Sequence, residues 1–133
     1  MKDQQYTYPK KEHLCGKITT EELFLKGSSF VVYPIRIVFC KNSEGNGIPV
    51  RLLASVSKKR FKKAVDRNLV KRQIREAYRK NKLGLIELLK EEKQEISLGI
   101  VYLSSETIES SKIEDAISQG FKILMRKLLQ KRE

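Results

Sequence analysis

The first half of the chain predicts a short helix followed by two strands. A helix is expected from a threonine cap, Thr19 or Thr20, to a stop at Gly27. The segment FVVYPIRIVFC that follows is rich in β-branched and aromatic residues, which is typical of strand. Because Pro34 cannot donate a ladder hydrogen bond, we expect it to separate a short strand from a longer one over Ile35–Cys40.

A turn and a further strand are predicted next. NSEGNG, residues 42–47, contains two glycines and two asparagines and is typical of a turn. In Pro49–Ser57 every second residue is apolar, which predicts a strand with one core face. That face consists of Val50, Leu52, Ala54 and Val56. Because the intervening turn is short, we expect this strand to pair with Ile35–Cys40.

The second half predicts two amphipathic helices on either side of a strand. Val70, Ile74 and Ala77 fall on one stripe of the first helix, and the leucine-rich segment LGLIELLK after it can cover a core. Ile96–Leu103 predicts the strand. The second helix is predicted from apolar residues spaced by three and four, which are Ile113, Ala116, Ile117, Gly120, Phe121, Leu124 and Leu128.

These elements predict a single α+β domain that spans residues 1–133. Residues 1–12 are polar and are expected to form a flexible lead-in. The expected order is α-β-β-β-α-β-α, counting the strand pair that Pro34 divides. The amphipathic stripes predict a sandwich in which the helices cover one face of the sheet.

The charge of the chain is concentrated in one segment. Of 28 Lys+Arg and 16 Asp+Glu, twelve cations and only two acids fall in residues 58–82, so this segment carries +10 of the net +12. Stepping 100° per residue places Asn68, Lys71, Arg72, Arg75 and Arg79 on a different side from the apolar stripe. The pattern predicts a helix with a core face and a cationic face, which favours a nucleic acid as partner.

Catalytic and metal-binding motifs are missing from the sequence. His13, the single histidine, stands beside Glu12 in the polar lead-in, so a serine nucleophile lacks a base. Cys15 and Cys40 form no CxxC motif, and a structural zinc site lacks ligands. No apolar run approaches the roughly 20 residues that cross a bilayer. We therefore expect a soluble, cytoplasmic protein without a membrane partner.

Three aromatic residues are open to two interpretations. Phe24, Tyr33 and Phe39 lie in or near the predicted first helix and strands. We favour a place in the core for each of them. Alternatively, aromatic side chains on an uncovered sheet face can stack on the bases of a single strand, at roughly 1–3 kcal/mol per base.

The basic segment carries a spaced signature. It reads SVSKK at residues 55–59, AVDRN at 64–68, KR at 71–72 and RE at 75–76. In this pattern the chain resembles the protein subunit of bacterial ribonuclease P, a family known for an Arg-Asn-Arg motif. Two residues depart from the family pattern, because Leu69 stands where the second arginine is usual and Thr20 stands where many members carry an aromatic.

The resemblance implies the fold and the division of labour of that family. The fold would be the predicted α-β-β-β-α-β-α order with a left-handed crossover, similar to a ribosomal-protein domain. The complex removes the 5′ leader of precursor tRNA, and its RNA subunit holds the active site and the catalytic Mg²⁺. This chain would then contribute no catalytic residue, and the Mg²⁺ would be bound mainly by the RNA subunit. We predict no metal-ligating residue in this chain and no obligate protein partner.

The resemblance also implies which residues meet RNA. A cleft between the first helix and the sheet, with Phe24 and Phe39 as lining, would hold the single-stranded leader. The side chains expected against RNA are Lys58, Lys59, Lys63, Arg67, Asn68, Lys71, Arg72, Arg75 and Arg79.

Two other functions are weighed against this one. A ribosomal or ribosome-assembly RNA-binding protein could have the same fold and charge. A DNA-binding helix-turn-helix module is disfavoured, because a strand rather than a short helix and tight turn precedes the basic helix.

Overall fold

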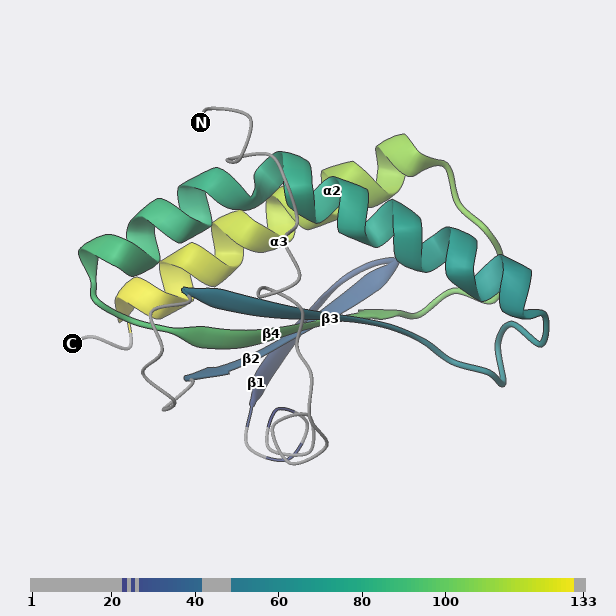
Figure 1. Cartoon of the computed structure of the whole chain (residues 1–133), viewed down its shortest axis with the longest axis horizontal. Coiled ribbons are helices and arrows are strands. Elements are labelled where there is room, and N and C mark those ends of the chain that lie inside the picture. Colours follow the sequence, from purple (N-terminus) through teal and green to yellow (C-terminus); the bar gives the residue numbers. More distant parts are fainter. Residues whose placement is uncertain (1–22, 24, 26, 42–48, 131–133) are drawn as a thin grey trace.

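The computed structural model describes residues 23, 25, 27–41 and 49–130. Within them, four strands and two helices form one layer of sheet and one layer of helices (Figure 1). The elements are β1 (Ser28–Val32), β2 (Ile35–Lys41), β3 (Val50–Val56), α2 (Ala64–Glu91), β4 (Ile96–Tyr102) and α3 (Ser110–Gln130). None of the described helices is long and apolar enough to span a membrane.

The sheet has the strand order β1-β2-β4-β3. β4 lies antiparallel to β2, with Ile37 opposite Ile100, and parallel to β3, with Leu52 opposite Leu98. The expected pairing of Pro49–Ser57 with Ile35–Cys40 is therefore wrong, since β4 lies between these two strands. The physical reason is burial, because all but one residue of β4 are buried, as a central strand requires. β3 alternates buried and half-buried residues, which suits the sheet edge.

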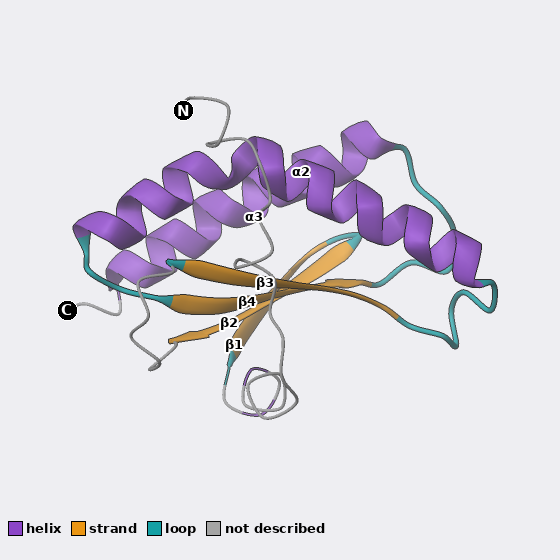
Figure 2. Ribbon diagram, viewed as in Figure 1, coloured by secondary structure: helices purple, strands orange, loops and turns teal. Residues whose placement is uncertain are grey.

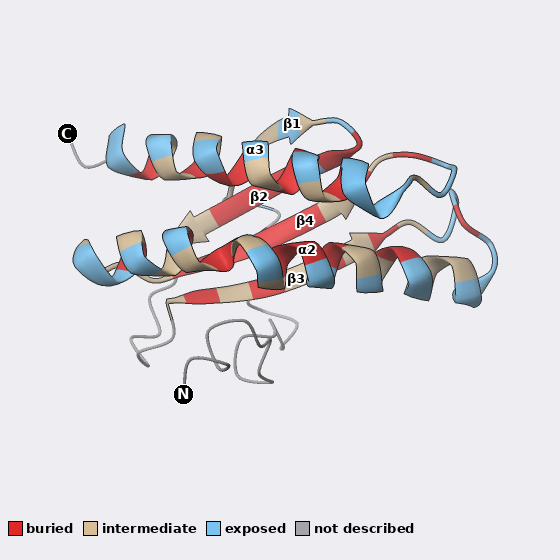
Figure 3. Ribbon diagram, turned by 90° about the horizontal axis from the view of Figure 1, so that it is seen from above, coloured by how far each residue is buried: buried red, intermediate tan, exposed pale blue. Residues whose placement is uncertain are grey.

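Both helices cover the same face of the sheet (Figure 2). The described core lies between these layers, and the buried stripes of α2 and α3 face the strands (Figure 3). Figure 3 is seen from the helix side, with β3 and β4 pointing to the right and β4 above β3. A chain that leaves β3, passes through α2 and returns in β4 thus makes the left-handed crossover that the resemblance implied.

The two helices pack side by side over the sheet. The ring of Tyr78 in α2 meets the ring of Phe121 in α3 edge-on, with 6.1 Å between centroids. Nearer the start of α3, the Lys80 ammonium lies 2.9 Å from a carboxylate oxygen of Glu114. All seven residues predicted as the apolar stripe of the C-terminal helix are buried. The leucine-rich segment is confirmed as core-facing at Leu85 and Leu89, and it continues α2 without a break.

The opposite face of the sheet carries a smaller apolar cluster. Leu23 is fully buried against Val38, with Cys40 and Leu53 packed beside them. Leu23 lies so close to Gly99 of β4 that a β-carbon there would be 3.0 Å from its Cδ2 atom. Most of the predicted first helix, the lead-in at residues 1–12 and the turn at 42–47 lie outside the described residues.

Candidate nucleic-acid interface

The first half of α2 presents an apolar side to the sheet and a cationic side away from it. Val70, Ile74 and Ala77 are fully buried, as predicted. Asn68, Arg72 and Arg75 are exposed, and Lys71 and Arg79 are half-buried. Leu69, at the position where the family usually has arginine, is also exposed. The predicted cationic face is thus present on the folded chain.

The segment that leads into α2 adds further cations to the same end of the molecule. We call residues 57–63 the lysine loop; Lys58, Lys59, Lys62 and Lys63 in it are all exposed. The loop is a compact turn, because the Phe61 amide donates to the Ser57 carbonyl at 3.1 Å and the Lys59 amide donates to Ser57 Oγ at 3.1 Å. Lys62 belongs to this group although the family signature did not single it out.

Arg67 has internal partners. Its Nη1 atom donates to the carbonyl oxygens of Phe61 at 2.8 Å and of Lys62 at 3.0 Å. Arg60, in the loop itself, donates to the carbonyl oxygen of Leu103, the residue that follows β4. A position in a sequence pattern does not show where a guanidinium points, so neither contact was predicted.

Arg79 forms an ion pair within α2. Its guanidinium donates to the carboxylate of Glu76, one turn earlier in the helix. This hydrogen bond lowers the pKa of Glu76 below its usual value. The spacing of three residues is the available signal for such a pair in the sequence. Glu76 offsets one charge of the cationic face, at its end farthest from the lysine loop.

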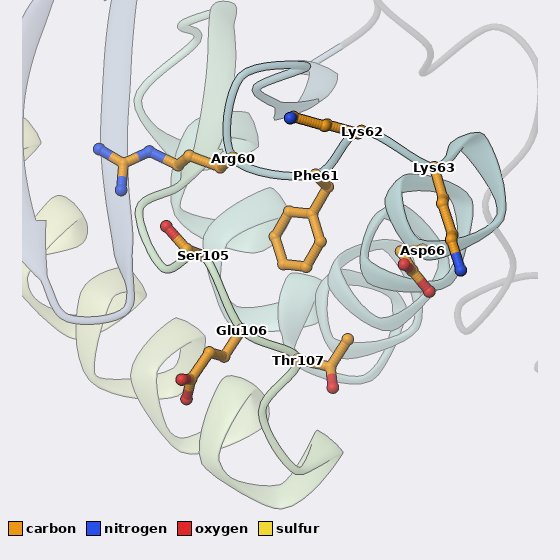
Figure 4. A pocket seen from close by; sticks show the side chains of 8 residues that line it. All are labelled: Arg60, Phe61, Lys62, Lys63, Asp66, Ser105, Glu106 and Thr107. Atoms are coloured by element: carbon orange, nitrogen blue, oxygen red, sulfur yellow. The ribbon is translucent and has the colours of Figure 1, made fainter.

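A shallow hollow of about 430 Å³ opens where the lysine loop meets the segment after β4 (Figure 4). The Phe61 ring points into the space between these two segments, and the Arg60 side chain extends away from it. Phe61 also packs on Tyr102, with 5.9 Å between ring centroids. The hollow is lined by Arg60, Phe61, Lys62, Lys63, Asp66, Ser105, Glu106 and Thr107.

The aromatic residues Phe39 and Tyr33 differ in burial. Phe39 is only 1% exposed and lies on the helix-covered face, where its ring meets Phe30 edge-on. It therefore has no surface to line a leader cleft, and that expectation is wrong, whereas its place in the core is confirmed. Tyr33 is 67% exposed, so the core interpretation is wrong for this residue. Phe24 lies outside the described residues.

Metal ligands do not gather anywhere in the part of the chain that the structure describes. There, no group of three or more His, Cys, Asp or Glu side chains is placed to hold a metal ion. Mg²⁺ prefers near-octahedral oxygen coordination with several waters and one or two carboxylates. The acidic residue nearest the lysine loop in sequence is Asp66, which has cationic neighbours at Lys63 and Arg67. The described residues therefore do not fit a dedicated magnesium site of their own.

Comparison with known proteins points to one family. The family model described as Ribonuclease P matches residues 8–128. The chain is 38% identical over 111 residues to the "Ribonuclease P protein component" of Porphyromonas gingivalis, which covers 84% of this chain and 81% of that protein. A second relative of that description, from Chlorobaculum tepidum, is 36% identical over 77 residues, which is 56% of this chain and 50% of that protein.

Solved structures show the same fold. The Staphylococcus aureus RNase P protein superimposes with a TM-score of 0.65 at 23% identity, over 85% of this chain and 94% of that one. The RNase P protein of Thermotoga maritima gives a TM-score of 0.65 at 24% identity, over 86% of this chain and 96% of that one.

Proposed function

The chain belongs to the ribonuclease P protein family, and we propose that it grips the RNA subunit and the 5′ leader of precursor tRNA while the RNA subunit cleaves the phosphodiester. Membership makes the chain a subunit of an endoribonuclease complex that processes tRNA. The proposal adds which subunit binds RNA and which cleaves it, and which side chains of this chain contact RNA. It also assigns the complex to the bacterial cytoplasm, where precursor tRNA is made.

The cationic face of α2 is the observation that carries this proposal. Arg72 and Arg75 project from the side of the helix opposite its buried stripe, with Lys71 between that side and the sheet. Arginine can bind a phosphate through two parallel hydrogen bonds, and lysine acts as a point charge. Neutralising several phosphates together releases counterions, so a compact patch binds RNA more strongly than scattered charges.

The proposed contacts follow the two parts of this surface. The lysine loop contributes Lys58, Lys59 and Lys63, and α2 contributes Asn68, Lys71, Arg72, Arg75 and Arg79. Asn68 can both donate and accept, which suits a ribose or base edge. Arg67 belongs to the same end of α2, where its guanidinium is bonded to the lysine loop.

Bond cleavage is assigned to the RNA subunit. The described residues supply no metal-binding cluster. Mg²⁺ held by RNA would supply charge stabilisation and an activated water for phosphodiester hydrolysis. This chain would bind and orient the two RNAs so that the leader junction lies at that metal.

The leader is proposed to lie on the sheet face away from α2 and α3, and Phe24 of the predicted first helix stays a proposed contact. Phe39 takes no part in this contact because it is buried on the other face. Exposed apolar side chains at the outer sheet edge and the first turn, Val31 and Tyr33, provide surface for unpaired bases.

Cleavage of precursor tRNA at low Mg²⁺ tests the proposal. The purified chain, the RNA subunit and both together are each incubated with the same substrate. We expect cleavage by the RNA alone to be slow, cleavage with both to be faster, and none with the chain alone. Cleavage by the chain alone, or no stimulation of the RNA, would overturn the proposal. Sequencing of co-purified RNA is a second test, in which ribosomal RNA as the main partner would count against it.

A further inference from the structure

The lysine loop is fixed to the body of the protein at three places, two of them against β4 and the residue that follows it, and one against α2. Phe61 anchors it from within, through its ring on Tyr102 of β4. Arg60 anchors its middle through the carbonyl of Leu103. Arg67 of α2 anchors its second half through two carbonyl oxygens. A loop with four exposed lysines is thereby held in one conformation although its charges repel one another.

The geometry of Arg67 explains how one side chain can hold two residues of the lysine loop. Both contacts come from the same Nη1 atom, which has two hydrogens and donates one to each carbonyl at 2.8 and 3.0 Å. Hydrogen bonds from an ionised donor are roughly twice as strong as neutral ones. The carbonyl oxygens belong to Phe61 and Lys62, the residues at which the loop turns from the core toward α2.

We infer that Arg67 is a positioning residue, which acts on RNA through the lysine loop that it holds, and that Lys62 is one of the RNA contacts that it positions. The inference rests on the proposed function and changes the role that the family signature implies for Arg67. Lys62 is exposed, and in Figure 4 its side chain leaves the loop in a different direction from the Phe61 ring. Lys62 is thus presented to a partner in the way that Lys58 and Lys59 are, by exposure on a fixed backbone.

The energetic advantage of this arrangement is preorganisation. A mobile loop would lose conformational freedom on binding, and that loss would subtract from the gain of each phosphate contact. Hydrogen bonds that fix the loop before binding remove this cost. We therefore expect the contributions of Arg67 and Lys62 to the binding free energy to depend on one another, because the effects of residues in one network are not additive.

Hydrogen exchange in the free protein tests the first half of the inference without RNA. The Phe61 amide, which is bonded to the Ser57 carbonyl, reports on the loop. In Arg67→Gln we expect this amide to exchange at least about tenfold faster than in the wild type. Arg75→Gln removes the same charge from an exposed position of the same helix and should leave the rate unchanged. Arg67→Lys, which keeps a charged donor, should give an intermediate rate. Equal exchange in Arg67→Gln and wild type would overturn the inference.

A double-mutant cycle in this chain, measured as affinity for the RNA subunit, tests whether Arg67 acts through Lys62. Lys62→Ala should weaken binding by about three- to fivefold in the wild-type background and by less than half of that in Arg67→Gln. In the control cycle, the fold-losses of affinity caused by Arg75→Gln and by Lys62→Ala should simply multiply in the double variant. If the fold-losses of affinity caused by Arg67→Gln and Lys62→Ala also simply multiply, Arg67 does not act through Lys62 and the inference is wrong. If the wild-type chain fails to bind the RNA subunit at all, the proposed function fails, whereas the exchange result still decides whether Arg67 fixes the loop.

Discussion

Gly120 of α3 lies directly on Ile37 of β2, so closely that a β-carbon at position 120 would overlap the Cδ1 atom of Ile37. Both residues are buried. The helix layer approaches the sheet at this point because glycine has no side chain. The sequence contains the glycine within the apolar stripe of the helix, but only the structure shows which strand residue occupies the space.

Gly120→Ala is expected to lower the free energy of unfolding by about 1–2 kcal/mol, since overpacking costs about 1–3 kcal/mol and alanine regains up to about 1 kcal/mol in helix propensity. Ile37→Val removes the overlapping atom, so the double variant should be more stable than the sum of the two single losses predicts. Urea denaturation measures this. Gly84→Ala in α2 is the control, because its nearest atom, Met125 Sδ, lies 3.9 Å away, and it should stabilise the protein. Strict additivity of Gly120→Ala and Ile37→Val would contradict the packing argument.

Replacing Arg72 and Arg75 together with alanine is expected to weaken binding to the RNA subunit and to flatten its salt dependence. The slope of log affinity against log salt should fall by about 0.7–0.9 for each phosphate that the variant no longer neutralises. Lys122→Ala with Arg126→Ala removes the same charge from exposed positions of α3 and should change the slope less. Titrations at several salt concentrations measure both. Equal slopes for the two pairs would show that net charge, rather than the face of α2, sets the affinity.

The periodicity of the sequence predicted the secondary structure and its core-facing residues well. Val70, Ile74 and Ala77 in α2 are buried because each turn of the helix brings them back to the sheet. The order of the strands in the sheet was harder to predict, because the turn residues at 42–47 favoured a hairpin between the strands on either side of them. The better signal was the near-continuous apolar run of β4, which is typical of a central strand.

The candidate site was predictable in position but less so in the role of each residue. Helical spacing placed Arg72 and Arg75 on the exposed side correctly. It could not show that the Arg67 guanidinium turns back to the Lys62 carbonyl, since that contact depends on the path of the loop. Likewise, the alternation of β2 could not show which of its two faces the helices cover, and that choice decides the role of Phe39.

Tyr102→Phe is expected to lower the free energy of unfolding by about 1 kcal/mol near neutral pH, because the Tyr102 hydroxyl donates to the Glu106 carbonyl at 2.7 Å. Burial raises the pKa of Tyr102 above its usual value of 10.0. A raised pKa in the folded state means that the protonated form stabilises the fold fully below pH 10 and that this contribution is lost as the pH rises further. The difference in stability between wild type and Tyr102→Phe should therefore shrink above pH 10. Denaturation at pH 7 to 11 measures it, and a constant difference would contradict the role of the hydroxyl.

Phe39→Leu is expected to affect stability and to spare the leader contact. The ring is buried in the core between the sheet and the helices, so its loss should lower the free energy of unfolding by about 1–2 kcal/mol. Affinity for precursor tRNA relative to mature tRNA isolates the leader, and this ratio should stay within about twofold of the wild type at temperatures where the variant is folded. Tyr33→Ala is the matched comparison, because this exposed side chain should change stability by less than about 0.5 kcal/mol. A selective loss of leader affinity in Phe39→Leu would place its ring against the leader and contradict its position in the core.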